Sequence, residues 1–393
     1  MPSGRHLLQI PGPTNIPDRV LKALGTPIID HRSPDAAQLV RACLDGLQTI
    51  FRTQDPVLIY SSSGTGAWEA ALVNTLNPGD RVLACETGQF GAQWATVAKN
   101  IGLRAELIPG DWRHGANPAA IAERLSADRE HEIRAVLVLH NETSTGITSD
   151  IPAVRGAMDS AHHPALLMVD NISSLASIDY RHTEWGVDVS VGASQKGLML
   201  PPGLGINAVS PKALEAARSS RFPKNYWRWQ EILEWNTKGF FPYTPATAML
   251  YGLRESLAML REEGLENVLA RHARLAEATR RAVCAWGLEF QAENPAERSN
   301  SITAIRMPEG HSEAGFRALV RERFNLSLGA GLGKVAGKLF RIGHMGDFND
   351  LMLAGALSGV EMGMTLADIP HRKGGVDAAL EYLTESPAIA ANG

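Results

Sequence analysis

Residues 187–197, VDVSVGASQKG, place a lysine, Lys196, just beyond a strand-like apolar run. A second apolar run, residues 165–170 (ALLMVD), lies upstream and ends on an acid, Asp170. A charged side chain at the end of a buried strand is costly unless it has a partner. Lys196 and Asp170 therefore indicate either a functional site at neighbouring strand ends or two polar residues that remain exposed there.

One cofactor requires both groups of this pair. Pyridoxal phosphate forms a Schiff base with a lysine and takes an acidic partner at its pyridinium nitrogen. On this interpretation, Asp170 keeps the ring nitrogen protonated, so that the ring accepts electrons from the substrate's α-carbon. Lys196 holds the cofactor aldehyde and then acts as a base, and its desolvation near a cationic ring lowers its pKa as that role requires.

The composition of the 393-residue chain is that of an ordinary globular protein, with 20% charged and 44% hydrophobic residues. The net charge of −4 and the lack of a basic run argue against a nucleic-acid binder. No apolar stretch is long enough to span a membrane, and no signal-length apolar core follows the start, so we expect a cytoplasmic location. Cys43, Cys85 and Cys284 form no metal-ligand pattern, so we expect neither a metal nor a disulfide framework.

From about residue 35 to residue 215 the chain alternates apolar runs with stretches of helical spacing. This alternation is typical of βαβ units and a mostly parallel sheet, and the near-continuous apolar runs indicate a sheet covered on both faces. The predicted strands lie near residues 57–60, 81–84, 104–108, 135–139, 165–170 and 187–191. Ligands of such sheets bind beyond the carboxyl ends of the strands. Polar clusters occupy those ends, in residues 61–66, 140–146, 170–174 and 194–197.

The chain after about residue 246 has a different pattern. A helical stretch over residues 246–286 is interrupted at Gly264 and followed by Gly287, which predicts two helices and a boundary. Further strands are predicted at residues 301–306 and 339–342, and further helices at residues 313–324 and 350–365. We therefore predict an α/β chain of two domains. Residues 1–285 form an N-terminal segment and the large domain, and residues 286–393 form a smaller C-terminal α+β domain.

Two further groups fit a phosphate and a carboxylate but also have simpler explanations. Residues 63–66 (SGTG) lie between a predicted strand and a predicted helix, where glycines let the backbone approach an anion and helix amides attract it. A tight turn explains the same residues. Arg341, within LFRIGH at residues 339–344, can bind a carboxylate bidentately, or it can be a surface ion-pair residue.

Taken together, the motifs resemble those of the class V, fold-type I pyridoxal phosphate aminotransferases, and within them the serine–glyoxylate and alanine–glyoxylate aminotransferases. The resemblance extends from Pro11 to about Asp368 and rests on the order and joint presence of the motifs. It implies a mostly parallel seven-stranded sheet flanked by helices in the large domain. The motifs are PGPTNIP (11–17), DHRSP (30–34), SGTGAWEA (63–70), HNETSTG (140–146), VDNISS (169–174), GASQKGLMLPPG (192–203), YTPAT (243–247) and FRIGH (340–344).

The resemblance implies a role for each matching residue around the cofactor, pyridoxal 5′-phosphate. Lys196 matches the Schiff-base lysine, and Asp170 matches the pyridinium partner. Phe90 matches an aromatic residue that stacks on the pyridine ring, whereas without the resemblance core packing would explain it. The other implied contacts are Ser63, Gly64, Thr65 and Gln195 at the phosphate, and a hydroxyl of Thr143 or Ser144 near the ring.

The resemblance also implies contacts from a second subunit and contacts to the substrate. Tyr243, Thr244 and Thr247 match residues that reach the phosphate from the partner subunit, which implies a homodimer with active sites at the interface. Arg341 matches the arginine that binds the substrate carboxylate, and Asn15 matches a residue near the substrate.

The expected reaction transfers an amino group from a small L-amino acid, L-serine or alternatively L-alanine, to glyoxylate. The products are glycine and hydroxypyruvate or pyruvate, and the two half-reactions predict ping-pong kinetics. An aspartate–glyoxylate enzyme is the alternative, and it would need a second cation, for which Arg32 is a candidate. A lyase or desulfurase on the same fold ranks lower, because a desulfurase needs a nucleophilic cysteine on a loop. A non-catalytic protein that kept the fold is disfavoured by the presence of both Lys196 and Asp170.

Overall fold

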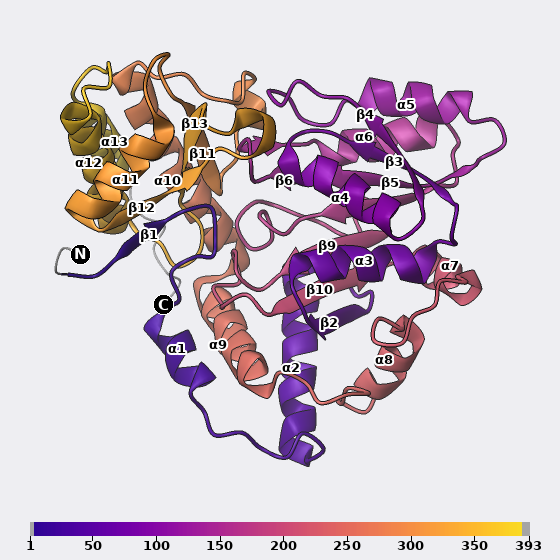
Figure 1. Ribbon diagram of the computed structural model, residues 1–393. Helices are drawn as coiled ribbons and strands as arrows, with labels where there is room; N and C mark the ends of the chain where they lie inside the picture. The colour runs from indigo at the N-terminus through magenta and orange to yellow at the C-terminus, as the bar shows by residue number, and fades with distance from the viewer. Residues whose placement is uncertain (1–3, 387–393) are drawn as a thin grey trace.

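A mostly parallel sheet forms the centre of the larger part of the protein (Figure 1). The computed structural model describes residues 4–386, and within them this sheet has seven strands in the order β2-β10-β9-β8-β5-β3-β4. Neighbouring strands are parallel except at β10, which is antiparallel to both β2 and β9. The predicted α/β sheet is therefore confirmed. Its strands are β2 (Val57–Ser61), β3 (Arg81–Cys85), β4 (Arg104–Ile108), β5 (Ile133–Leu139), β8 (Leu166–Asp170), β9 (Val189–Ala193) and β10 (Leu204–Val209).

Both faces of this sheet are buried, as the continuous apolar runs predict. Side chains of one strand alternate between two cores: Ile59 and Val138 lie in one core, whereas Leu58 and Leu137 lie in the other. Successive residues of a strand point to opposite faces, so a strand that is apolar at every position needs cover on both sides. The covering helices are α2 (Pro34–Phe51), α3 (Gly64–Thr75), α4 (Gln89–Asn100), α5 (Pro118–Ala127), α6 (Ile151–Ser160), α7 (Pro211–Ser219), α8 (Trp229–Asn236) and α9 (Thr247–Glu263).

Four of these eight helices, α2, α5, α6 and α7, begin at a residue whose side chain caps the first turn. The Asn117 side chain accepts hydrogen bonds from two amides at the start of α5, and the Asp150 side chain accepts one at the start of α6. A proline follows each cap, in the first turn, where its missing N–H is not needed. Helix α4 differs, because its N-cap residue is Gly88, which has no side chain to accept a hydrogen bond.

The sequence does not predict β10, and it places β9 two residues too early. Strand β10 carries a glycine and Asn207 among its apolar residues, which disguises the strand pattern. Asn207 is tolerated in the core because its side-chain oxygen accepts a hydrogen bond from the Tyr60 hydroxyl at 3.0 Å. Strand β9 begins at Val189 because the side chain of Asp188 accepts a hydrogen bond from the Leu167 amide at 2.8 Å.

Within residues 4–386, a second sheet has four strands in the order β1-β12-β13-β11 and lies beside the large sheet (Figure 1). It has an apolar core of its own, which contains Phe316, Phe340 and Leu357. Its first strand, β1 (Leu7–Gln9), comes from the N-terminal segment and pairs in parallel with β12. The other elements of this part are α10 (Leu265–Trp286), β11 (Ile302–Arg306), α11 (Glu313–Phe324), β12 (Leu326–Ala330), β13 (Leu339–Gly343), α12 (Asp350–Leu366) and α13 (Gly375–Glu385). We keep the domain division after residue 285 as a proposal, and it falls one residue before α10 ends.

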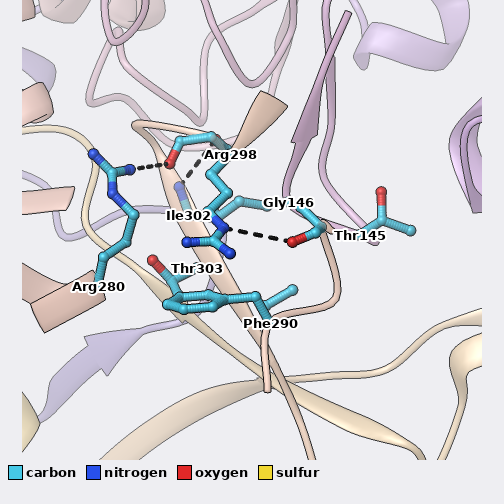
Figure 2. Close-up of a pocket in the computed structure, with 10 residues that line it drawn as sticks. Thr145, Gly146, Arg280, Phe290, Arg298, Ile302 and Thr303 are labelled. Carbon is cyan, nitrogen blue, oxygen red and sulfur yellow. Dashed lines mark hydrogen bonds between the residues drawn. The ribbon is translucent and has the colours of Figure 1, made fainter. Parts of the chain in front are cut away.

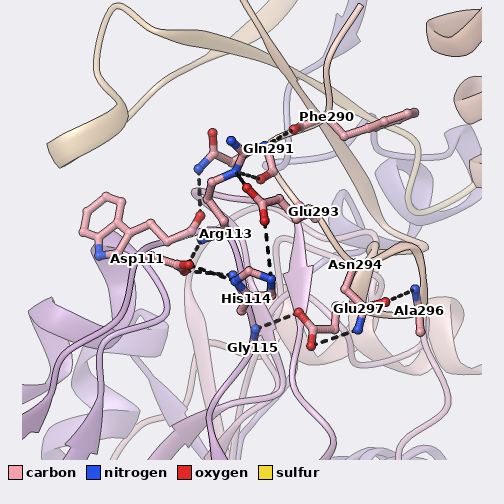
Figure 3. A network of polar contacts seen from close by, with 12 residues as sticks. Asp111, Arg113, His114, Gly115, Phe290, Gln291, Glu293, Asn294, Ala296 and Glu297 are labelled. Carbon is pink, nitrogen blue, oxygen red and sulfur yellow. Dashed lines mark hydrogen bonds and ion pairs between the residues drawn. The ribbon is translucent and has the colours of Figure 1, made fainter.

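Polar contacts join the two parts at the loop that precedes α5 (Figure 3). Arg113 pairs with Glu289 at 2.6 Å and with Glu293 at 2.9 Å. His114 bonds to Asp111 at 2.8 Å, and its other ring nitrogen lies 3.7 Å from Glu293. Ion pairs that remain partly exposed contribute little free energy singly, so these contacts fix the relative position of the two parts more than they stabilise the fold.

Helices α1 (Asp18–Leu24) and α13, near the two ends of the chain, are not predicted from the sequence. Helix α1 packs on α9, where Arg19 pairs with Glu255 at 2.7 Å and with Glu262 at 2.6 Å. A helix of this length is marginal by itself and depends on tertiary contacts that sequence spacing does not reveal. Among the helices in residues 4–386, none is both long and apolar enough to cross a membrane.

Candidate active site

The polar clusters predicted from the sequence lie together at the carboxyl-terminal end of the strands of the large sheet. The His140 amide, just after β5, donates to the Asp170 carbonyl at the end of β8 at 2.8 Å. On the far side of β9, Leu204 pairs with Ser61 at the end of β2, and the Ser194 amide donates to the Leu204 carbonyl at 3.0 Å. The loops that follow β2, β5, β8 and β9 therefore lie at the carboxyl ends of parallel strands, where ligands of such sheets bind.

Asp170, at the carboxyl-terminal end of β8, is buried, with 3% of its surface exposed. Its two carboxylate oxygens accept hydrogen bonds from the Trp68 indole N–H and from the Ile172 amide, each at 2.7 Å. Burial raises the pKa of the Asp170 carboxyl to about 7, although both hydrogen bonds oppose the rise. Each oxygen keeps the capacity to accept a further hydrogen bond. The sequence does not predict this role of Trp68, although Trp68 lies in the SGTGAWEA motif one helical turn after Gly64.

Lys196 is buried in the loop that follows β9. Its Nζ donates to the Pro11 carbonyl, and the Thr14 hydroxyl donates to the Lys196 carbonyl at 3.3 Å, so the opening motif packs on this loop. Burial, reinforced by the Arg341 guanidinium and opposed by the Asp170 carboxylate, lowers the pKa of the Lys196 amine to about 8. Arg341 and Asp170 therefore both lie close enough to Lys196 to affect its charge.

Arg341 lies in the middle of β13, and 6% of its surface is exposed, which contradicts the alternative of a surface ion-pair residue. Its Nε donates to the Ala330 carbonyl and its Nη1 to the Thr143 carbonyl, both at 2.7 Å. Burial lowers the pKa of the guanidinium to about 10, and the Glu142 carboxylate opposes the fall. Because both contacts are neutral carbonyls, the cation keeps the capacity to bind an anion. Asn15, also expected near the substrate, donates to the backbone of β1 at 3.2 Å.

The hydroxyl groups of the loop after β5 form hydrogen bonds with other residues of the chain. The Ser144 hydroxyl donates to the Glu142 carboxylate at 2.6 Å, and the Thr143 hydroxyl donates to the Ser173 hydroxyl at 2.8 Å. Both hydroxyls that the resemblance places near the ring therefore already have a partner. Phe90 lies half-buried in the first turn of α4, next to this loop.

The expected phosphate-binding turn coincides with the start of α3. Ser63 is the N-cap residue of α3, but its side chain makes no capping hydrogen bond, and Thr65 is exposed. Gly64 is buried, and a Cβ there would lie 2.3 Å from the Ile172 side chain. The first amides of this helix therefore remain available to an anion. Gln195, in the lysine loop, has a buried side-chain oxygen without a hydrogen-bond partner among residues 4–386.

The residues expected at a subunit interface lie together near the start of α9. Thr247 is the first residue of α9 and is buried, whereas Thr244 is exposed. The Tyr243 ring stacks on Tyr226 with a centroid separation of 4.5 Å, and the Tyr226 hydroxyl donates to the Ser61 carbonyl at 3.4 Å. Within one subunit Tyr243 thus packs against Tyr226, and it is Tyr226 that contacts the end of β2.

Most of the chain matches one known protein family. Residues 7–345 match the family described as Aminotransferase class-V. The chain belongs to the class-V aminotransferases. It is therefore a pyridoxal-phosphate-dependent transaminase with the fold-type I architecture, as the motifs indicate.

Individual relatives cover nearly the whole chain. A serine–glyoxylate aminotransferase of Methylorubrum extorquens is 50% identical over 391 residues, which cover 98% of this chain and 97% of the relative. An L-aspartate–glyoxylate aminotransferase of Paracoccus denitrificans is 45% identical over 383 residues, with 97% of both chains covered. The solved structure of pyridoxamine–pyruvate aminotransferase from Mesorhizobium loti matches with a TM-score of 0.89 at 28% identity and covers 98% of both chains.

The residues of the site fit the cofactor that this family implies. A protonated ring nitrogen needs an acceptor, and the buried Asp170 carboxylate has free lone pairs. A phosphate needs N–H donors, and the uncapped start of α3 supplies them. An aldehyde needs an amine, and the Lys196 side chain has room because Gly12 lies beside it: a Cβ at Gly12 would be 2.5 Å from Lys196 Cδ.

Proposed function

We propose that this transaminase moves the amino group of L-serine to glyoxylate and releases hydroxypyruvate and glycine. The serine–glyoxylate relative supports this pair, since it is 50% identical over 98% of this chain. The observation that carries the proposal is Arg341, a buried arginine whose hydrogen bonds are to two neutral carbonyls. Pro11 connects it to Lys196, because a Cβ at Gly329 would lie 2.5 Å from Pro11 and 3.1 Å from Arg341, and the Pro11 carbonyl accepts from Lys196. One guanidinium suits substrates with one carboxylate, and serine and glyoxylate each have one. L-alanine, which would give pyruvate, meets the same condition.

Pyridoxal 5′-phosphate would supply the aldehyde that takes up the amino group and the ring that delocalises electrons from the substrate α-carbon. We propose Lys196 as the residue that binds its aldehyde, Asp170 at its ring nitrogen and Phe90 on its ring face. Further proposed contacts are Ser63, Gly64, Thr65 and Gln195 at the phosphate, Thr143 or Ser144 near the ring, and Tyr243, Thr244 and Thr247 from a partner subunit.

We propose that Lys196 moves the proton at Cα of the substrate and that Asp170 acts at the ring nitrogen. A pKa of about 8 leaves part of the Lys196 amine neutral near neutral pH. The neutral amine takes the proton from Cα of the amino donor, and the protonated amine returns a proton to Cα of the forming glycine. Asp170 would keep the ring nitrogen protonated, because its carboxylate can accept a hydrogen bond from an N–H there.

The aspartate alternative would need a second cation for the second carboxylate. Arg32, the candidate from the sequence, is exposed, and its guanidinium lies 4.3 Å from the centroid of the Trp235 ring. This stacking favours a structural role for Arg32 in the loop before α2. The desulfurase alternative also loses support, because burial raises the pKa of the Cys43 and Cys85 thiols to about 12, which disfavours the reactive thiolate.

We further propose a cytoplasmic homodimer with active sites at the subunit interface. The segment between α1 and α2 extends away from the rest of the subunit (Figure 1), and it carries Ile28 with 67% of its surface exposed.

Steady-state kinetics with L-serine, L-alanine and L-aspartate against glyoxylate test the donor. We expect kcat/KM to be highest for L-serine, by about 10-fold or more over L-aspartate, and we expect ping-pong patterns. A higher kcat/KM for L-aspartate would overturn the donor assignment. The purified enzyme should also be yellow and should lose that absorbance band when L-serine is added. If no amino acid changes the spectrum, the proposed chemistry is wrong.

Replacing Arg341 by lysine should weaken donor binding. Lysine keeps the charge but loses the planar fork, so we expect KM for L-serine to rise by about 10–100-fold, the equivalent of one charge-assisted hydrogen bond. The affinity of the apoprotein for pyridoxal 5′-phosphate should stay the same. Arg274→Lys is a matched control, because Arg274 is a buried arginine that pairs with Asp350 instead. Equal donor KM values in Arg341→Lys and the wild type would contradict the role.

A further inference from the structure

Helix α4, which carries Phe90, receives its N-terminal cap from another part of the chain. The Gln89 amide donates to the Ser144 hydroxyl oxygen at 2.9 Å. The Phe90 and Gly91 amides donate to the same oxygen of Glu142, Oε2, at 3.1 and 3.0 Å. The first N–H groups of a helix lack partners within the helix, so these three contacts replace the cap that Gly88 cannot provide.

Glu142 is fully buried, and its carboxylate is bound entirely by N–H and O–H groups. The other oxygen, Oε1, accepts hydrogen bonds from the Ser144 amide at 2.9 Å and from the Ser144 hydroxyl at 2.6 Å. A buried carboxylate is costly unless such donors surround it, and a helix N-terminus stabilises it further. Burial raises the pKa of Glu142, and these four donors oppose the rise.

The chain makes room for this carboxylate at one glycine. A Cβ at Gly88 would lie 2.4 Å from Glu142 Cγ and 2.5 Å from Glu142 Cδ. Any larger residue at position 88 would therefore displace the carboxylate from the start of α4. Gly88 therefore has two effects: it has no side chain to cap α4, and its small size leaves room for the Glu142 carboxylate to do so.

Glu142 lies on the two-residue strand β6 (Asn141–Glu142), and the loop around it, residues 140–146, also contacts the other groups of the site. The amide of His140 donates to the Asp170 carbonyl, and the carbonyl of Thr143 accepts from Arg341. At its far end, the Gly146 carbonyl accepts from the Ser299 amide at 3.0 Å, which fixes the loop to the smaller part of the protein (Figure 2). Glu142 thus lies at the centre of a loop that touches the acid, the arginine and the aromatic residue.

We propose that Glu142 is a positioning residue whose buried carboxylate holds the first turn of α4, and through it the ring of Phe90, against the cofactor. The inference rests on the proposed roles of Phe90 and of the cofactor, and it does not depend on which amino acid is the donor. All four hydrogen bonds of the Glu142 carboxylate are to the protein itself. Its effect passes through the Phe90 and Gly91 amides.

Glu142→Gln tests the proposal with almost no change of shape. Glutamine replaces one acceptor oxygen by an NH₂ group, which would face either the two α4 amides or the two Ser144 donors. We expect the affinity of the apoprotein for pyridoxal 5′-phosphate to fall about 10-fold, the equivalent of one lost aromatic contact. Quenching of tryptophan fluorescence measures this affinity. We expect kcat to fall by about 10–100-fold, as for a misplaced catalytic group, while KM for the donor changes little.

A double-mutant cycle with Phe90→Leu separates positioning from general damage to the fold. If Glu142 acts through the ring, Glu142→Gln should have little further effect on cofactor affinity once the ring is gone. Fully additive losses would overturn the proposal. Wild-type affinity and kcat in Glu142→Gln would overturn it as well, and neither result would bear on the donor assignment.

Two further variants keep the test informative. Glu361→Gln is the matched control, since Glu361 likewise accepts from two backbone amides, those of Gly374 and Val376, but lies on α12. It should leave cofactor affinity and kcat unchanged. If Glu142→Gln fails to fold, Ser144→Ala removes the acceptor for the Gln89 amide and one hydrogen bond to Glu142. It should weaken cofactor binding in the same direction, and the same double-mutant cycle with Phe90→Leu separates this effect from a direct contact of Ser144 with the ring. Unchanged cofactor affinity in a folded Ser144→Ala protein would then count against the proposal.

Discussion

Lys196→Ala will lower the rate of transamination by about 10²–10⁴-fold or more, because it removes the group proposed to move the α-proton. The variant should also lose the yellow absorbance of the covalently bound cofactor, since alanine has no amine to bind an aldehyde. Both effects are measured on one sample, by steady-state kinetics with L-serine and glyoxylate and by the visible spectrum. Turnover close to that of the wild type would refute the role of Lys196.

The fold should persist in this variant. Lys196 is buried with a pKa lowered to about 8, so the wild-type protein already carries the cost of desolvating this amine. Removing it relieves that cost and leaves a cavity of a few methylene groups. Lys212→Ala is a suitable control, because Lys212 is a half-exposed lysine that donates to the Ala165 carbonyl at 2.8 Å near the opposite ends of the strands. It should keep full turnover.

The central sheet could be predicted from the sequence because its strands are apolar at nearly every position. Strands β2, β3, β4 and β5 begin within two residues of their expected positions. Strand β10 could not be predicted, because the partners that satisfy Asn207 come from distant segments, such as Tyr60 on β2. The pairing of β1 with β12 is equally invisible, since it joins Leu7 to Leu326 across most of the chain.

The candidate site shows the same limit at the level of single residues. Lys196, Asp170 and Arg341 could be named because their chemistry is specific and each follows or occupies a predicted strand. Trp68 and Glu142 lie in quoted motifs, but their roles depend on contacts across 102 and 52 residues of sequence, respectively. Spacing along the chain shows where a residue lies on its own element, and it does not show which distant group that residue touches.

Asp170→Asn will lower kcat by about 10²–10³-fold, as expected when a charged group that stabilises the transition state is lost. Asparagine is neutral at every working pH and cannot hold a proton on the ring nitrogen as a carboxylate does. Its side-chain oxygen can still accept from the Trp68 indole or from the Ile172 amide, but its NH₂ group then faces the other donor. The loss should appear in kcat for every donor, because each half-reaction uses the same ring nitrogen.

The same substitution should change how the stability of the cofactor-free protein depends on pH. Burial raises the pKa of Asp170 from an ordinary 3.8 to about 7, so between these values the folded state holds a proton that the unfolded chain has released. Folding stability due to this group therefore falls as the pH rises from about 4 to about 7. The asparagine side chain does not titrate, so the variant lacks this contribution to the change of unfolding free energy with pH.

Thermal unfolding of both apoproteins at several pH values between 4 and 8 measures this difference. The midpoint of Asp170→Asn relative to that of the wild type should rise steadily as the pH rises to about 7 and then level off. Other buried carboxyl groups, such as Glu142, are common to both proteins and cancel in the comparison. A difference that stays constant across the range would mean that Asp170 is ionised at low pH in the folded protein, and the acid would then not be the desolvated group on which the proposed site depends.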